Sequence, residues 1–165
     1  MEYQENEKNY QVINYSEQLP FLIHNITRDG MLDKDEKQKE MLEHWHSEVE
    51  LGYTYAGHAI HYIDGKIYRE EPGKLLITNS ESIHKVISDT DIPEDVEIVA
   101  TILLINYDFL KGVIPDLPEK YFLTEVKCDM EPIRKIIELF AQYADNKKIL
   151  QPYEKLFLTG KMYEL

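Results

Sequence analysis

The sequence predicts a mainly β fold, with short strands arranged as a sandwich or barrel and α-helices at the carboxy-terminal end. Short apolar segments with turn residues between them recur from residue 48 to residue 107, a spacing typical of antiparallel sheets. Asp64-Gly65 separates two of these segments, and this dipeptide favours a tight hairpin because both turn positions need positive φ. Beyond Pro115 and Pro118 the apolar residues change to helical spacing. The 165 residues fit one domain with a substantial core.

The amino-terminal region is expected to hold a leader, two strands and a charged loop. Residues 1–9 are polar and predict a frayed leader, whereas residues 10–15 and 19–27 have the β-branched and aromatic content of strands. Asp29-Gly30 is a turn signal. Residues 32–43 are dense in charge and predict a solvated loop; a helical turn or a loop over the mouth of a barrel is the alternative.

Six further strands are expected in the middle of the chain, over residues 48–56, 58–63, 66–69, 75–79, 83–88 and 96–107. The last of them is the most apolar. We therefore expect it in the centre of one sheet, buried on both faces.

Two amphipathic helices are expected to follow. Residues 129–132 resemble a helix start, with acidic residues at the positive end of the dipole and a proline in the first turn, and Pro152 opens the second helix. One helical face is expected to pack partly on the barrel and the other mainly between subunits of a homodimer. The residues predicted for dimerisation are Ile133, Ile136, Ile137, Phe140, Leu156, Phe157 and Tyr163.

These elements predict three parts: an amino-terminal arm with the first strand at 1–18, a barrel at 19–128, and a helical dimerisation segment at 129–165. The second helix reaches Leu165 in mid-pattern. We therefore expect the native chain to continue into a linker and a further domain.

The amino-acid composition indicates which partners this chain can bind and in which cellular compartment it is expected. The formal net charge of −13 opposes association with DNA, because DNA binding depends on Lys and Arg that neutralise phosphates. No apolar run has the length of a membrane span, and no signal peptide is recognisable. The single cysteine, Cys128, agrees with a reducing cytoplasm and is expected to be inert.

The main chemical signal is the set His44, His46, Glu50 and His84. On a strand, residues at even spacing share a face, so the first three are expected to point the same way. Imidazole and carboxylate groups suit a divalent metal such as zinc, nickel, iron or manganese. The same side chains could instead hydrogen-bond one another or a ligand without any metal.

At these residues the sequence resembles the cupin superfamily. The spacing from His44 through His46 and Glu50 to Gly57 fits the first cupin motif, although Lys37, Gln38 and Lys39 occupy the area of its leading glycine. The second motif keeps Gly73 and His84, while Asn79-Ser80-Glu81 and Ser88 replace its Pro, Gly and Asn. This resemblance selects a double-stranded β-helix, the jelly-roll barrel, among the all-β folds.

Within the cupins, residues 19–165 resemble the amino-terminal sensing domain of AraC-type transcriptional regulators. The shared features are HWH followed by acidic residues, an IDGKIY hairpin leading to EEPGKLLITNSESIHKV, and two terminal helices. The resemblance implies a domain that binds a small-molecule effector, such as a sugar or related metabolite, and dimerises through its helices. Sequence-specific DNA binding would belong to a carboxy-terminal helix-turn-helix domain absent from this chain.

A stand-alone metal-dependent cupin enzyme, a dioxygenase or isomerase, is the alternative, and a simple metabolite-binding cupin is a third reading. No further acid–base pair is recognisable in the sequence, so we assign no catalytic residue. His58 and His61 are expected near the surface or a pocket rim, and His24 is expected to be structural. Trp45 alternates away from its neighbouring histidines and is expected to pack behind the strand.

Overall fold

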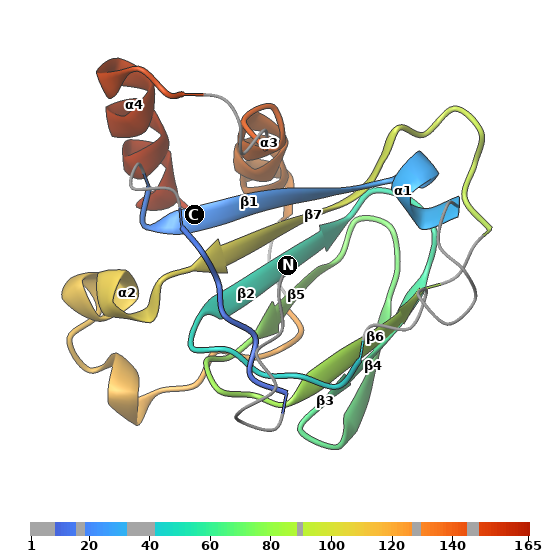
Figure 1. Ribbon diagram of the computed structural model, residues 1–165, viewed down its shortest axis with the longest axis horizontal. Coiled ribbons are helices and arrows are strands. Elements are labelled where there is room, and N and C mark those ends of the chain that lie inside the picture. The colour runs from blue at the N-terminus through green and yellow to red at the C-terminus, as the bar shows by residue number, and fades with distance from the viewer. Residues whose placement is uncertain (1–8, 16–18, 33–41, 89–90, 127–129, 145–148) are drawn as a thin grey trace.

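The computed structural model describes residues 9–15, 19–32, 42–88, 91–126, 130–144 and 149–165. Its described strands form two antiparallel sheets that face each other in a jelly-roll arrangement (Figure 1). The four-stranded sheet has the order β1 (Phe21–Thr27), β7 (Ile98–Ile105), β2 (Val49–Thr54), β5 (Leu75–Thr78). The three-stranded sheet has the order β4 (Lys66–Glu70), β3 (Ala59–Ile63), β6 (His84–Ser88). The predicted fold class is confirmed.

Strand β7 occupies the central position expected from its apolar sequence. It pairs with β1 on one side and with β2 on the other. Its neighbours Leu103 and Leu104 point to opposite faces of the sheet, and both are almost completely buried. Both faces of the four-stranded sheet are therefore covered, one by the second sheet and the other by helices.

The Asp64-Gly65 hairpin is confirmed as well. Ile63 pairs with Lys66, and the two turn residues have φ of 49° and 75°. Two consecutive positive φ angles are the signature of a two-residue turn whose twist matches that of the flanking strands.

The hydrophobic core lies between the outer face of the four-stranded sheet and the helices α3 (Met130–Ala141) and α4 (Pro152–Met162), which stand on this face in Figure 1. Phe140 of α3 is completely buried, with its ring centroid 5.4 Å from that of Phe21 on β1. Ile137 is buried beside it. These two members of the predicted dimerisation set thus belong to the core of the chain, whereas Leu156 of α4 and Tyr163, the residue after this helix, are exposed.

Several local predictions were wrong. The turn expected at Asp29-Gly30 lies inside a short helix, α1 (Arg28–Leu32). The strand expected to reach residue 107 ends at Ile105, because the Asn106 side chain accepts a hydrogen bond from the Phe109 backbone N–H and so caps helix α2 (Tyr107–Val113). A 3-10 helix, Leu117–Glu119, follows. Residues 33–41 of the predicted charged loop, and the predicted helix start at Asp129, lie outside the described residues.

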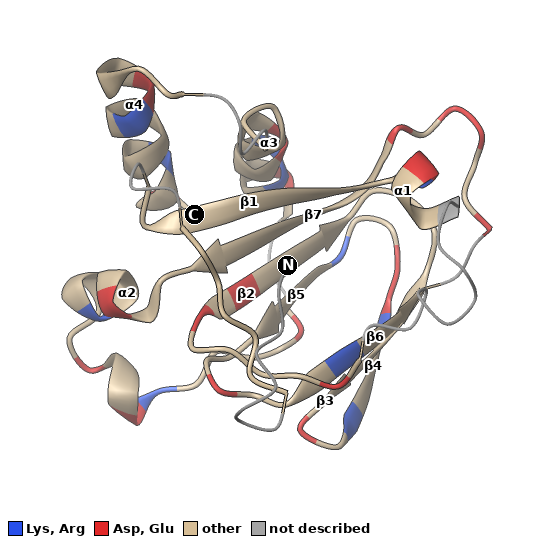
Figure 2. Ribbon diagram, viewed as in Figure 1, with Lys and Arg blue, Asp and Glu red and all other residues tan. Residues whose placement is uncertain are grey.

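The first predicted strand, residues 10–15, is also absent as a strand. Tyr10 forms only an isolated parallel bridge with Trp45. Acidic residues recur along the loop that leads into β7, and α1 beside it carries Asp29, as the red segments of Figure 2 show. No described helix is long and apolar enough to cross a bilayer.

Candidate metal and ligand site

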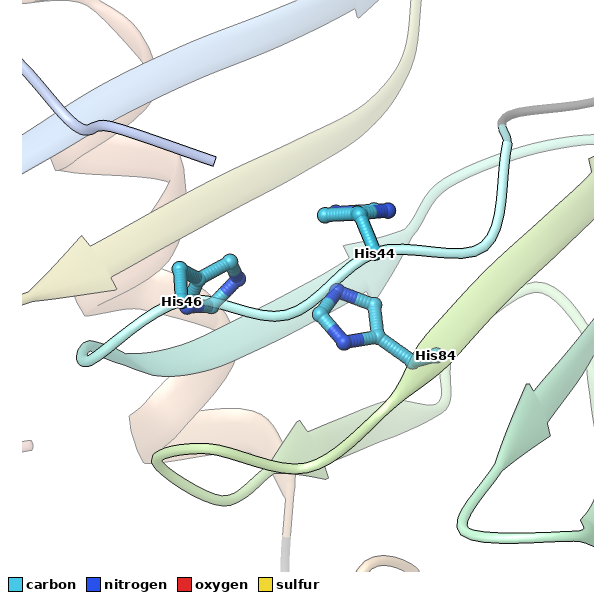
Figure 3. A group of neighbouring side chains, drawn as sticks. All are labelled: His44, His46 and His84. Atoms are coloured by element: carbon cyan, nitrogen blue, oxygen red, sulfur yellow. The ribbon is translucent and has the colours of Figure 1, made fainter. Parts of the chain in front are cut away.

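Three histidines from two distant segments converge between the sheets (Figure 3). His44 and His46 belong to the extended segment that precedes β2, and His84 begins β6. One nitrogen from each imidazole can be chosen so that all three lie within 4.8 Å of one another. Each residue is at most 2% exposed. The expectation that the two motifs meet at one place is therefore met by the geometry.

A backbone bridge holds the two segments together. The His44 N–H donates to the His84 carbonyl at 2.9 Å, and the His84 N–H donates to the His44 carbonyl at 2.8 Å. This reciprocal pair brings the two ring centroids to 4.1 Å. The segment around His46 is not part of β2, which begins only at Val49. The shared direction of the histidines therefore comes from this bridge rather than from one continuous strand.

Two of the three rings have one nitrogen fixed by the backbone. His44 Nδ1 donates to the Leu42 carbonyl at 2.8 Å, and His84 Nδ1 donates to the Ser82 carbonyl at 2.8 Å. A carbonyl can only accept, so Nδ1 carries the proton in each ring and Nε2 is the nitrogen that can bind a metal. This arrangement is the usual support of a metal-binding histidine.

Buried nitrogen atoms without partners support the same interpretation. His84 Nε2 and both ring nitrogens of His46 are buried without a hydrogen-bond partner in the described structure. A buried polar atom without a partner is costly, and such atoms in a native fold call for a bound ion, ligand or water. The three imidazoles therefore fit a divalent metal by position, and His46 and His84 also fit it by their buried nitrogens without partners.

Glu50 on β2 supplies a carboxylate to the cluster, as its even spacing predicted. Its Oε2 lies 3.4 Å from His46 Nε2 and 3.9 Å from His84 Nε2. Burial by itself would raise the pKa of Glu50, but the contact with His46 and the proximity of His84 outweigh burial and hold the pKa at about 2. The carboxyl group is therefore ionised at neutral pH.

Two of the imidazoles, those of His44 and His84, are held in the neutral state. Burial, and then the neighbouring His84, lower the pKa of His44 to about 4. Burial likewise lowers the pKa of His84. Neutral imidazoles beside an ionised carboxylate are the protonation states that a divalent cation needs in its ligands.

The amino-terminal arm packs against the segment that carries the histidines. The Gln11 N–H donates to the Trp45 carbonyl at 2.9 Å, and the Trp45 N–H donates to the Asn9 carbonyl at 3.1 Å. The Trp45 ring contacts the Tyr10 ring, with centroids 4.6 Å apart, so this indole packs away from the cluster as expected. A change in the position of His44 or His46 would therefore reach the arm through the backbone.

Three buried acidic or basic groups in or near the site were missed or misplaced by the sequence analysis. Glu48 is buried, with its Oε2 3.6 Å from His46 Nδ1. His61, expected near the surface or a rim, is only 4% exposed and lies 2.6 Å from the equally buried Glu70. The period-two pattern of β3 could have placed His61 on the inner face, because buried Ile63 shares that face. His58 is exposed, in agreement with its prediction.

A surface cavity of about 350 Å³ lies elsewhere, where β1 meets α1. Its lining consists of Thr27, Arg28, Asp29, Glu94, Asp95, Val96 and Glu97. No histidine of the cluster contributes to it. The donor atoms, and not this cavity, define the candidate site.

Comparison with known proteins gives one family and several distant structures. Residues 32–165 match the AraC-like ligand binding domain family. No curated protein sequence matches. ToxT of Vibrio cholerae, bound to (E)-4-(8-methylnaphthalen-1-yl)but-3-enoic acid, aligns at 12% identity over 87% of this chain, with a TM-score of 0.46. A cupin 2 conserved barrel domain protein of Salinispora arenicola aligns at 15% identity over 70% of this chain and 97% of its own, with a TM-score of 0.36.

Oxalate decarboxylase of Bacillus subtilis, a protein with Mn(II) centres, aligns at 21% identity over 41% of this chain, with a TM-score of 0.33. The chain spans 55% of the ToxT chain and 18% of the decarboxylase chain.

Proposed function

The chain belongs to the AraC-like ligand binding domain family, and from this premise we propose that it senses a small-molecule effector inside its barrel on behalf of a transcriptional regulator. The observation that carries this proposal is the buried convergence of His44, His46 and His84 beside the carboxylate of Glu50. This is a set of buried metal- or ligand-binding groups between the two sheets.

We propose that these four residues hold a divalent cation. Three imidazoles and a carboxylate suit zinc, nickel, iron or manganese. When bound, the ion supplies a Lewis acid that attracts an oxygen of the effector. The residues of the chain hold the ion, exclude water and fix its position relative to the amino-terminal arm.

The signal that the effector is bound would pass from the barrel to the rest of the regulator through the amino-terminal arm and the helices. The arm is hydrogen-bonded to the backbone of Trp45, between the two histidines of the first motif. An effector that binds more tightly to one conformation of this segment increases the fraction of molecules whose arm is in the matching position. The size of this change is limited by the difference in the affinity of the effector for the two conformations. The exposed apolar side chains of α4 would form the homodimer contact, and DNA would be bound by another domain because this one carries a net charge of −13.

A metal-dependent enzyme is the second candidate, since the donor set alone is also that of a catalytic centre. One experiment distinguishes the sensing domain from the enzyme. The chain is stripped of metal with a chelator, reloaded separately with zinc, nickel, iron and manganese, and screened by thermal shift against a panel of sugars and organic acids.

Any molecule that stabilises the protein is then incubated with it and recovered. A sensing domain gives saturable stabilisation and returns the molecule unchanged, whereas conversion of the molecule would establish the enzyme. The variant His46→Gln should abolish both metal uptake and stabilisation, and the exposed His58→Gln should change neither. Stabilisation that persists in His46→Gln would place the effector elsewhere.

A further inference from the structure

A second polar pair lies inside the barrel, outside the cluster described above. His61 on β3 and Glu70 on β4 are 4% and 5% exposed, and His61 Nε2 lies 2.6 Å from Glu70 Oε2. Neither residue belongs to the histidine motifs of the sequence. Since the pair is enclosed on an inner sheet face, surface solvation does not account for it.

The pair leaves buried hydrogen-bonding capacity unused. Glu70 Oε1 is buried without a hydrogen-bond partner among the described residues, and so is the hydroxyl of Thr54, which is 3% exposed. Glu70 Oε1 approaches β2 at Gly52, where a side chain is missing: a Cβ atom there would lie 3.6 Å from this oxygen. Thr54 continues the same face of β2 two residues later. Each of these two oxygens can accept a hydrogen bond, and no described residue donates one.

The pair lies one pleat away from the histidine cluster in both sheets. His84 pairs with Ile63, and His61 is the next residue of β3 on the same face. Glu50 of the cluster and Gly52 beside Glu70 are likewise consecutive on one face of β2. Two strand residues span about 7 Å, which is the length of a short carbon chain.

We propose that Glu70, held by His61, forms with Thr54 a second polar subsite that accepts hydroxyl groups of the effector, while an oxygen at the other end of the same molecule binds at the three histidines. This inference rests on the proposed function, since it concerns the same inner faces of the two sheets. It names the ligand class as a small hydroxylated carboxylic acid of about six carbons.

The ligand class follows from the groups at the two ends of the proposed site, the metal-binding histidines and the Glu70–Thr54 subsite. A dication with one carboxylate ligand keeps a net positive charge and favours an anionic oxygen. The orphan oxygen of Glu70 needs a donor, and a hydroxyl provides one without adding charge. A hydrocarbon chain of the same length would leave Glu70 and Thr54 without partners, and binding would be weaker by about tenfold or more.

The test uses gluconate and hexanoate, two six-carbon monocarboxylates that differ in their hydroxyl groups. Calorimetric titration of the zinc-loaded chain should give a Kd for gluconate at least about tenfold lower than for hexanoate. Glu70→Gln, which places an amide donor where the orphan acceptor stood, should raise the gluconate Kd by about tenfold or more and leave the hexanoate Kd within about twofold. Thr54→Val should act in the same direction. Glu71→Gln, which changes the exposed neighbouring carboxylate paired with Lys74, is the matched control and should change neither value.

Zinc content and thermal unfolding, measured on every variant, separate the possible failures. Equal Kd values for both acids, binding of neither, or equal losses for both acids in Glu70→Gln would overturn the subsite. Loss of zinc or of the fold in both Glu70→Gln and Thr54→Val would also overturn it and assign these residues a structural role. If the wild-type chain takes up no zinc, the metal part of the proposed function fails. A preference of the metal-free chain for gluconate that depends on Glu70 would still support the subsite.

Discussion

The backbones of His44 and His84 hydrogen-bond to each other in both directions, at 2.9 and 2.8 Å. Both residues are also members of the donor cluster. The distance between the two motifs is therefore set by main-chain atoms, which any residue except proline preserves at these positions. The donor set can be altered without removing the bridge that positions it.

Replacement of His84 by Asn should therefore remove metal binding without unfolding the domain. The lost Nε2 is a donor of the cluster, so we expect metal affinity to fall by about a hundredfold or more. Far-ultraviolet circular dichroism should remain that of wild type. Metal affinity is measured by competition with a chromophoric chelator. His58→Asn, on an exposed position, is the control and should retain wild-type affinity.

Acid should destabilise the metal-free protein in a way that depends on His44. The pKa of this residue is about 4 in the fold, against an ordinary value of 6.5. Below pH 6.5 the unfolded chain takes up a proton that the folded chain refuses, so the free energy of unfolding falls as the pH drops from about 6.5 towards 4. At pH 4.5 this single residue should cost about 2 to 3 kcal/mol relative to neutral pH.

Urea unfolding of chelator-treated protein at pH 7 and pH 4.5 measures this effect. His44→Gln has no proton to gain at this position, so it should lose less stability between the two pH values than wild type. An equal loss in both proteins would show that His44 is not held neutral by the fold.

Features produced by interactions between residues close together in the sequence could be predicted, whereas features that depend on competing or distant interactions could not. The Asp64-Gly65 hairpin and the burial of β7 depend on local turn chemistry and on a long apolar run, and both were predicted. Helix α2 depends on one cap, the Asn106 side chain, which competes with continuation of an apolar strand. The sequence alone did not resolve that competition.

The candidate site divides in the same way. Motif spacing identified His44, His46 and Glu50 in one short segment and His84 in a second, because each motif is local in the sequence. His61 lies opposite Tyr68, and Glu70 is the next residue of β4 on the same face, a register that the Asp64-Gly65 turn fixes. The approach of Glu70 to Gly52 depends on how the two sheets face each other, and this relationship leaves no short-range pattern in the sequence.

Helix α3 should contribute strongly to the stability of the barrel. Phe140 is completely buried against the four-stranded sheet, so Phe140→Ala should lower the free energy of unfolding by about 3 to 5 kcal/mol. Phe157→Ala removes the same ring from a position on α4 that is 44% exposed, and should cost about 1 kcal/mol or less in the monomer. Both values come from chemical denaturation at low protein concentration. Similar losses for the two variants would contradict the core described for α3.

Helix α4 presents an apolar stripe that we expect to form the homodimer contact. Its exposed members are Tyr153, 71% exposed, Leu156, 76% exposed, and Phe157, 44% exposed. They recur at helical spacing, so they share one face that the described part of the chain leaves uncovered. Leu156→Glu places a charge in the middle of this face and should raise the dimer dissociation constant by about tenfold or more, measured by sedimentation equilibrium.

The matched control for this prediction is Leu123→Glu, because Leu123 is an equally apolar residue, 82% exposed, outside α4. If exposed apolar surface in general drove self-association, both variants would weaken the dimer. If α4 is the contact, only Leu156→Glu weakens it, and its effect on the free energy of unfolding of the monomer is small because Leu156 contributes little to the core. A wild-type chain that sediments as a monomer at all accessible concentrations would remove α4 from the proposed mechanism and leave transmission to the arm beside Trp45.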